Sequence, residues 1–363
     1  MEKILLISPK DNNFFNFRSE LIMKLVKDKF EVILVCPYGC KMDYFINQGC
    51  RFIDIQVDRR GTNPINDMKL IYNYFKVIKM EQPKIVLTYT AKSSIYGGFV
   101  CRLLNIPYIT NNAGIMNNEG WLGKLMPILY KIGFQKASCI MYQNNEEREY
   151  FNRLFDYKLY YRSIPGSGVN LDVFKLKPYP NDDVIIFNFV ARIVSIKGIN
   201  EFLECATRIK NKYPNTRFII YGEYDDKRYE KKINDLAGKG IVEYGGIKID
   251  MKPYIELAHA VIHPSYYEGM TNVVLEHSAM GRVCLGADIA GVREGIEDGL
   301  TGYLFEQKNV DSMIKAVEKF INLPYESKRE MGLKARKKME TEFNRELVVN
   351  TYIEEIKRIV GSV

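Results

Sequence analysis

Short apolar runs alternate with amphipathic segments along the chain. In the first half, runs rich in β-branched residues occupy 3–8, 31–36, 51–57, 84–89, 107–110 and 138–143. Segments with helical periodicity lie between them, as at 66–80 and 95–104. Such alternation is typical of a parallel sheet covered on both faces by helices. The pattern therefore predicts an α/β fold with a doubly wound sheet.

The alternation restarts after residues 164–183, a segment rich in Pro, Gly and Asn, and from about residue 309 the pattern is wholly helical. A chain of 363 residues is longer than one hydrophobic core usually supports. We therefore predict two Rossmann-like domains, 1–172 and 183–343, and a helix over 344–363 that crosses back to the first domain. A ligand cleft is expected between the carboxyl edges of the two sheets.

Composition excludes several classes of protein. Hydrophobic residues make up 47% of the chain and charged residues 26%, which argues against disorder. No apolar run approaches the roughly 18 residues that span a bilayer, and the first run is too short for a signal peptide. The seven cysteines form no C-x-x-C pair, which argues against a zinc ribbon or a disulfide framework. We interpret the chain as cytoplasmic, soluble or peripheral.

Positive charge is concentrated in the first half. Residues 1–175 hold 24 Lys and Arg against 16 Asp and Glu, whereas residues 176–363 hold 28 against 28. The whole excess of +8 is therefore N-terminal. An asymmetric basic half suggests an anionic partner, with nucleic acid, a phosphorylated ligand and a membrane leaflet as alternatives.

The stretch "HPSYYEGMTNVVLEHSAMG" predicts a strand, a loop and a helix with two glutamates. Thr271 or Asn272 suits the N-cap and Gly281 the C′ position, so Glu276 lies in the early turns and Glu268 in the preceding loop.

Both carboxylates are expected at the positive end of this helix, beside the backbone N–H groups of residues 269–272. Because an ionised carboxylate only accepts hydrogen bonds, the pair suits the hydroxyls of a sugar. The alternative is an ordinary loop carboxylate and a charge on a helix face.

A second cluster follows the strand at 184–191. Arg192 and Lys197 bring a guanidinium and an ammonium to the carboxyl end of the sheet, a pair suited to a diphosphate unless both are solvated loop charges. No D-x-D pair or His/Asp cluster follows a strand, so we expect no metal or other cofactor. We interpret His259 and His263 as structural, since four-residue spacing on a strand gives no ligand geometry.

Four motifs occur in a familiar order: "IPGSGVNLDVF", "VARIVSIKG", "YYEGMTNVVLEHSAMG" and "GVREGIEDGLTGYLF". Together they resemble the retaining glycosyltransferases of family 4, with the GT-B fold of two doubly wound Rossmann-like domains facing each other across a cleft. In the first half, "FNFRSELI" and "LTYTAKSSIYGG" look like a subgroup that extends capsular, O-antigen or protein-glycan oligosaccharides on an undecaprenyl-diphosphate lipid.

The resemblance implies roles for the site residues. Arg192 and Lys197 would hold the donor diphosphate, Glu276 the ribose, and the transferred sugar would lie against Glu268, Gly269, Met270, Thr271 and Asn272. Catalysis would rest on Glu268, Arg192 and Lys197.

The chain departs from the family pattern at two places. The first strand is followed by "SPKDNNFFNFRSE", which lacks the Gly-rich turn of many members. A common His after the fifth strand is replaced by "TNNAGIMNNEG", in which Asn111, Asn112 and Gly114 are candidates to line the acceptor site.

Several basic residues are candidates for contact with the acceptor or the membrane. Lys92, Arg59 and Arg60 suit an acceptor phosphate or are solvated loop charges. Residues 120–134 form an apolar stripe whose Lys124 and Lys131 suit anionic lipid, unless the stripe is simply core.

The sequence thus predicts a metal-independent, retaining hexosyltransferase on the inner face of the bacterial cytoplasmic membrane. It would move a hexose or N-acetylhexosamine from a nucleotide-sugar, UDP-linked, to a lipid-diphosphate-linked saccharide in surface polysaccharide or glycan synthesis. Its partners would be that donor, that acceptor and an anionic membrane surface, and not nucleic acid. The alternative is a non-catalytic sugar-nucleotide-binding regulator of the same fold. A nicotinamide oxidoreductase would need a G-x-G-x-x-G turn, which the chain lacks.

Overall fold

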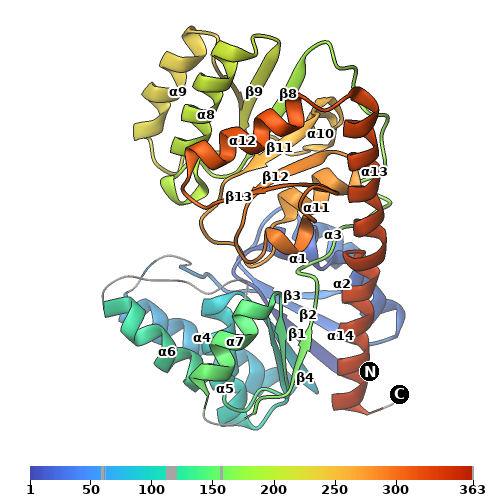
Figure 1. The fold of residues 1–363 in the computed structure, drawn as a ribbon. Helices are drawn as coiled ribbons and strands as arrows, with labels where there is room; N and C mark the ends of the chain where they lie inside the picture. The colour runs from blue at the N-terminus through green and yellow to red at the C-terminus, as the bar shows by residue number, and fades with distance from the viewer. Residues whose placement is uncertain (59–60, 62, 112–120, 156–157, 362–363) are drawn as a thin grey trace. The chain divides into compact units, whose positions relative to one another are not determined.

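Two parallel sheets carry the strands in the computed structural model, which describes residues 1–58, 61, 63–111, 121–155 and 158–361. The chain divides into two units (Figure 1). The first unit comprises Met1–Ser167 together with Glu346–Val363, and the second comprises Gly168–Arg345. The α/β class predicted from the apolar runs is confirmed.

The sheet of the first unit has seven strands in the order β3-β2-β1-β4-β5-β6-β7. The order reverses between β1 and β4, which makes this the switch point of the sheet. The predicted runs form β1 to β6, and the short, largely exposed β7 gave no apolar signal. The strands are β1 (Lys3–Ile7), β2 (Glu31–Cys36), β3 (Arg51–Asp54), β4 (Ile85–Tyr89), β5 (Tyr108–Asn111), β6 (Cys139–Tyr142) and β7 (Tyr161–Ser163).

The sheet of the second unit has six parallel strands in the order β10-β9-β8-β11-β12-β13. Its switch point lies between β8 and β11, so the loops after these two strands open at the same place. The apolar runs of the second half, at 184–191, 217–222, 241–246, 260–265, 283–288 and 302–305, all contain strands here. They are β8 (Ile185–Val190), β9 (Thr216–Tyr221), β10 (Glu243–Gly246), β11 (Ala260–His263), β12 (Val283–Ala287) and β13 (Gly302–Phe305).

Helices cover both faces of each sheet. The first unit holds α1 (Asp11–Phe17), α2 (Ser19–Lys27), α3 (Met42–Asn47), α4 (Pro64–Glu81), α5 (Ala91–Leu104), α6 (Trp121–Phe134), α7 (Asn145–Leu154) and nearly all of α14 (Arg345–Val360). The second holds α8 (Ile199–Lys212), α9 (Arg228–Gly238), α10 (Lys252–Leu257), α11 (Asn272–Ala279), α12 (Val310–Ile321) and α13 (Tyr325–Glu342). Side chains of one strand alternate between faces, so Ile4 and Leu6 join one core cluster and Leu5 and Ile7 another.

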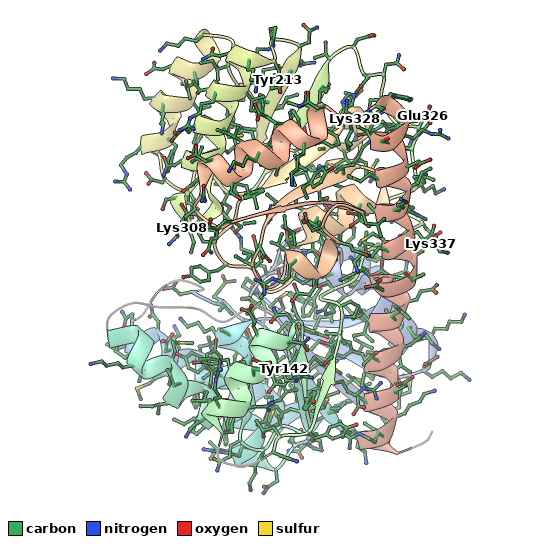
Figure 2. The ribbon with its side chains drawn as sticks, viewed as in Figure 1. Tyr142, Tyr213, Lys308, Glu326, Lys328 and Lys337 are labelled. Atoms are coloured by element: carbon green, nitrogen blue, oxygen red, sulfur yellow. The ribbon has the colours of Figure 1, made fainter. Side chains whose placement is uncertain are left out.

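The segment before β8 belongs to the second unit. Val169 N donates to Phe343 O at 2.8 Å, and Arg345 N donates to Val169 O at 3.1 Å, which ties the two ends of the unit together. Lys328 of α13, labelled in Figure 2, is buried, and its Nζ lies 2.7 Å from Asp182 Oδ2. Residues 173–182, which the sequence left between the predicted domains, are therefore fixed within this unit. Residues 168–172, which the sequence assigned to the first domain, belong to this unit as well.

The helix α14 packs on the sheet of the first unit through apolar residues at i, i+4 and i+8. Val348, Tyr352 and Ile356 lie in the core cluster that contains Ile4 and Leu6 of β1. This stripe is the expected face of an amphipathic helix. The unit is thus built from two segments far apart in the sequence.

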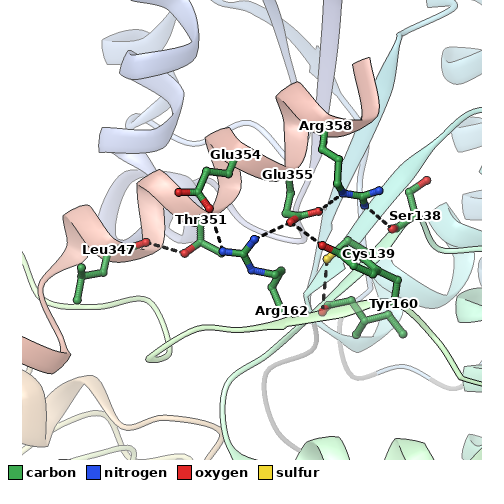
Figure 3. A network of polar contacts seen from close by, with 10 residues as sticks. Ser138, Cys139, Tyr160, Arg162, Leu347, Thr351, Glu354, Glu355 and Arg358 are labelled. Carbon is green, nitrogen blue, oxygen red and sulfur yellow. Dashed lines mark hydrogen bonds and ion pairs between the residues drawn. The ribbon is translucent and has the colours of Figure 1, made fainter. Parts of the chain in front are cut away.

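A buried carboxylate anchors the same helix (Figure 3). Glu355 has a side chain only 1% exposed, and it accepts hydrogen bonds from Tyr160 Oη at 3.1 Å, Arg162 Nη1 at 2.9 Å and Arg358 Nε at 2.7 Å. Arg358 Nη2 in turn donates to Ser138 O at 3.0 Å. Three donors satisfy the buried charge, so it does not oppose folding.

Replacing Glu355 by Ala should lower the free energy of unfolding by about 1.5–3 kcal/mol, because charge-assisted hydrogen bonds to α14 are lost. Glu354→Ala is the matched control, since its carboxylate is 62% exposed and contacts Arg162 at the rim. The control should shift stability by no more than about 0.5 kcal/mol. Urea unfolding of the whole chain checks this, and equal midpoints for the two variants would contradict it.

Candidate active site

Two oppositely charged side chains meet at the switch point of the second sheet. Lys197 ends the short 3₁₀ turn Ser195–Lys197 after β8, and Glu268 lies in the loop between β11 and α11. Lys197 Nζ is 2.6 Å from Glu268 Oε1 and 3.4 Å from Ser265 Oγ. The strand order brings the two predicted loops together, as expected for a ligand site in such a sheet.

The sequence interpretation of His263 misses a contact. His263 ends β11, and its Nε2 lies 3.1 Å from the same Glu268 Oε1. It does not act with His259, whose buried ring accepts from Ile186 N and contacts Asn181 O, so that residue is structural as predicted. The signal for His263 was its place at the carboxyl end of a strand beside the Glu268 loop.

Glu268 is held in its charged form. Burial raises the pKa of this carboxyl, but the hydrogen bonds and charges of His263 and Lys197 outweigh burial and lower the pKa to about 2. Among the residues that the structure describes, no hydrogen-bond donor contacts Oε2. An anionic oxygen that can accept from a ligand hydroxyl is therefore present at this site.

The loop before α11 rests on Gly291, in the loop after β12. Gly291 has φ +79°, and a Cβ there would lie 2.5 Å from Gly269 O and 2.8 Å from Glu268 O. Gly291 O accepts from Thr271 N at 2.9 Å, while Gly291 N donates to Glu294 Oε2 at 2.7 Å. The close approach needs a residue without Cβ. Gly291 therefore determines how closely the Glu268 loop packs on the loop after β12.

The helix α11 starts and ends as the sequence predicts. Thr271 is its N-cap, and Gly281 follows the last turn with φ +77°. The side chain of Met270 is buried among Val169, Leu275 and other apolar residues, so only its backbone faces the loop. The N-terminus of α11 therefore opens beside Glu268, with its N–H groups directed to the loop.

Glu276, one turn into α11, differs from Glu268. Burial raises the pKa of its carboxyl to about 7, and the charges of Arg345 and Lys252 offset only part of this effect. No hydrogen bond or ion pair joins its carboxylate to any side chain in the described part of the chain. The side chain is partly buried, so its carboxylate gains when a ligand supplies hydrogen-bond donors.

Arg192 follows β8, but its guanidinium does not reach the Lys197–Glu268 pair. Nη1 is 2.5 Å from Asp225 Oδ2, in the loop after β9, and the side chain of Arg192 is 48% exposed. The acidic partner was not predicted, because a lone Asp in a polar loop carries no signal. The sequence was right to put Arg192 at this sheet edge, and its phosphate role stays a prediction.

The candidates of the first unit have internal partners. Lys92 Nζ donates to Asp58 O and Gly61 O and lies 2.6 Å from Asp67 Oδ1, so it is no solvated loop lysine. Asn111 is 3% exposed, and its amide contacts Met141 O, Gln143 Nε2 and Arg18 Nη2.

The predictions for Arg59, Arg60, Asn112 and Gly114 fall on residues outside the described part of the chain. Lys124 and Lys131 lie on exposed positions of α6.

The chain is similar to known proteins over nearly its full length. A family model described as "Glycosyl transferases group 1" matches residues 173–338, and "Glycosyl transferase 4-like" matches residues 3–144. One relative is an Escherichia coli UDP-Gal:alpha-D-GlcNAc-diphosphoundecaprenol alpha-1,3-galactosyltransferase, 24% identical over 81% of this chain and 80% of that protein. Another is a Campylobacter jejuni N,N'-diacetylbacillosaminyl-diphospho-undecaprenol alpha-1,3-N-acetylgalactosaminyltransferase, 23% identical over 99% of this chain and 100% of that protein.

Solved structures share the fold. A glycosyltransferase from Rickettsia africae has a TM-score of 0.79 at 19% identity and covers 100% of this chain and 99% of its own. Anabaena HepE in complex with UDP also has a TM-score of 0.79, at 13% identity, and covers 99% of this chain and 100% of its own.

Two parallel sheets of matching architecture, the Lys197–Glu268 pair and the two family models lead to one conclusion. The chain is a glycosyltransferase that belongs to family 4 and has the GT-B fold.

Proposed function

We propose that this glycosyltransferase moves a hexose or N-acetylhexosamine from a UDP-sugar to a saccharide carried on a lipid diphosphate, with retention at the anomeric carbon. The observation that carries the proposal is the pair of acidic residues at the second switch point. Glu268 is anchored and charged, and Glu276 has no side-chain partner among the described residues. The named activities of the Escherichia coli and Campylobacter jejuni relatives support the donor and acceptor classes.

The two carboxylates suit different parts of a nucleotide-sugar. Glu276 has no protein donor in the described residues and would accept from the vicinal hydroxyls of the ribose. Glu268 stays ionised because its pKa is lowered to about 2, so it would face the sugar ring, where positive charge develops.

Charge on the leaving diphosphate needs positive groups. Lys197 and the N-terminus of α11 flank the site, and Arg192 would exchange Asp225 for a phosphate oxygen. Such preorganised charge is usually the largest contribution to catalysis. We infer that these groups neutralise the diphosphate without a divalent metal ion.

Exposed side chains of the first unit support contact with a membrane. On α4, Ile65, Met68 and Tyr72 are 65–74% exposed at i, i+3 and i+7. Both α4 and α6 contact α5, so this stripe and the lysines of α6 flank one helix. Within the described residues, no helix is both long and apolar enough to span a bilayer. We infer peripheral docking on anionic lipid at the inner face of the cytoplasmic membrane.

The central experiment is transfer of labelled sugar from a panel of UDP-sugars to a polyprenyl-diphosphate-linked saccharide. We expect turnover that persists in EDTA and a product with the anomeric configuration of the donor. Donor binding without turnover would instead favour the regulator, and a requirement for added Mg²⁺ or Mn²⁺ would remove metal independence from the proposal.

Glu276→Ala should weaken UDP binding about 10- to 100-fold by removing acceptors for ribose hydroxyls. Glu268→Gln should leave UDP affinity unchanged and lower kcat about 100- to 1,000-fold, because its charge acts on the transition state. Calorimetric titration with UDP and initial rates measure the two effects. Loss of UDP affinity in Glu268→Gln alone would reverse the assignment.

The same titrations repeated between pH 6 and 8 give an internal check. The carboxyl of Glu276 has a pKa raised to about 7 and ionises across this range, so the affinity of the unaltered protein for UDP should rise with pH. Phosphate ionisation in UDP contributes equally in all variants. The part of the rise due to Glu276 should disappear in Glu276→Ala.

Gly291→Ala should lower kcat/KM about 10-fold or more, since a methyl group there pushes the Glu268 loop off its position. Gly299→Ala is the control, because Gly299 has φ +77° but no atom lies within 4 Å of the place that a Cβ would take, so it carries the same backbone strain without the contact. Equal losses of activity in the two variants would attribute the effect to strain alone.

Binding of the whole chain to anionic liposomes should fall with salt, as surface charges are screened over about 10 Å at 0.1 M. Charge reversal of Lys124 and Lys131 should weaken it, whereas reversal of the exposed Lys231 and Lys239 of the second unit should not. Sedimentation with vesicles measures this. Equal binding to neutral and anionic vesicles would exclude the proposed surface.

A further inference from the structure

His263 is fixed in place by the sheet. It ends β11, and its backbone is in register with Gly286 of the neighbouring β12. Its side chain is 4% exposed, with Nε2 3.1 Å from Glu268 Oε1. Because the ionised carboxylate only accepts, His263 Nε2 carries the hydrogen and donates it.

Lys197 and His263 share one oxygen of Glu268. Lys197 Nζ lies 2.6 Å from Oε1, the oxygen that also accepts from His263. When a donor diphosphate binds, Lys197 has a second anionic partner besides Glu268, since its ammonium at this sheet edge is attracted to the phosphate. The imidazole, on a rigid strand, faces no such competition from the donor.

We propose that His263 is a positioning residue, whose Nε2–H holds the Glu268 carboxylate in its catalytic orientation when Lys197 turns to the donor diphosphate. This inference rests on the proposed function and assigns a role in it to a side chain that acts through Glu268. With Oε1 fixed by His263, Oε2 stays directed to the ligand.

The geometry explains why a histidine rather than a shorter polar residue stands here. The hydrogen bond starts from Nε2, the far nitrogen of the ring, so the donor must lie well beyond Cβ. A glutamine amide reaches about as far as Nε2, whereas an asparagine amide is one methylene shorter. The two substitutions therefore separate reach from polarity.

The experiment compares His263→Gln and His263→Asn in the transfer assay, with UDP titration and thermal unfolding of each variant. His263→Asn should lower kcat about 10- to 100-fold, the value of a hydrogen bond to a charged group, without loss of UDP affinity. His263→Gln should retain most of the kcat. His259→Gln, at the position directly before the same strand, should lower the unfolding temperature and leave kcat unchanged.

Each outcome decides the matter. Equal kcat in the unaltered protein and His263→Asn would overturn the positioning role while the proposed function stands. Equal losses in the Gln and Asn variants, in step with their unfolding temperatures, would show that His263 acts only in stability. No transfer by the unaltered protein, despite UDP binding, would overturn the proposed function and this inference together.

Discussion

The site of the second unit depends on one largely buried carboxylate, that of Glu268, which stays charged. Glu268 loses much of its hydration, and only a cation and a hydrogen-bond donor at close range can offset that loss. Lys197 comes from the turn after β8 and His263 from the end of β11. These two strands are neighbours because the strand order reverses there. The Glu268 loop keeps its position because Gly291 has no Cβ, which allows the carbonyl groups of Glu268 and Gly269 to approach closely. Sheet order, loop contact and charge thus depend on one another.

Similar burial has opposite effects on the two glutamates. Contacts with His263 and Lys197 lower the pKa of Glu268, whereas Glu276, with only more distant positive charges, has a raised pKa. Glu268 has its hydrogen-bond partners before any ligand binds, whereas Glu276 would receive its partners from the ligand. The first arrangement suits stabilisation of a transition state, and the second suits selective binding of a molecule that brings its own hydroxyls.

Local signals predicted much of this structure. Continuous apolar runs identified twelve of the strands, and capping chemistry gave the bounds of α11 through Thr271 and Gly281. Lys197 and Glu268 were found because each follows a strand.

Other features depend on tertiary geometry with no local pattern. Asp225 meets Arg192 across two loops. Asn111 turns its amide inward to Met141, Gln143 and Arg18. His263 was misjudged because periodicity describes which face a residue occupies and not what lies beyond the end of its strand.

The packing of α14 on β1 has a consequence for synthesis. Residues 346–361 leave the ribosome after the whole of the second unit, yet they complete the core of the first. The second unit is continuous in sequence and can acquire its own core while translation proceeds. The first must wait with Ile4 and Leu6 incompletely covered until α14 emerges. In this architecture the segment made first is the last to finish folding.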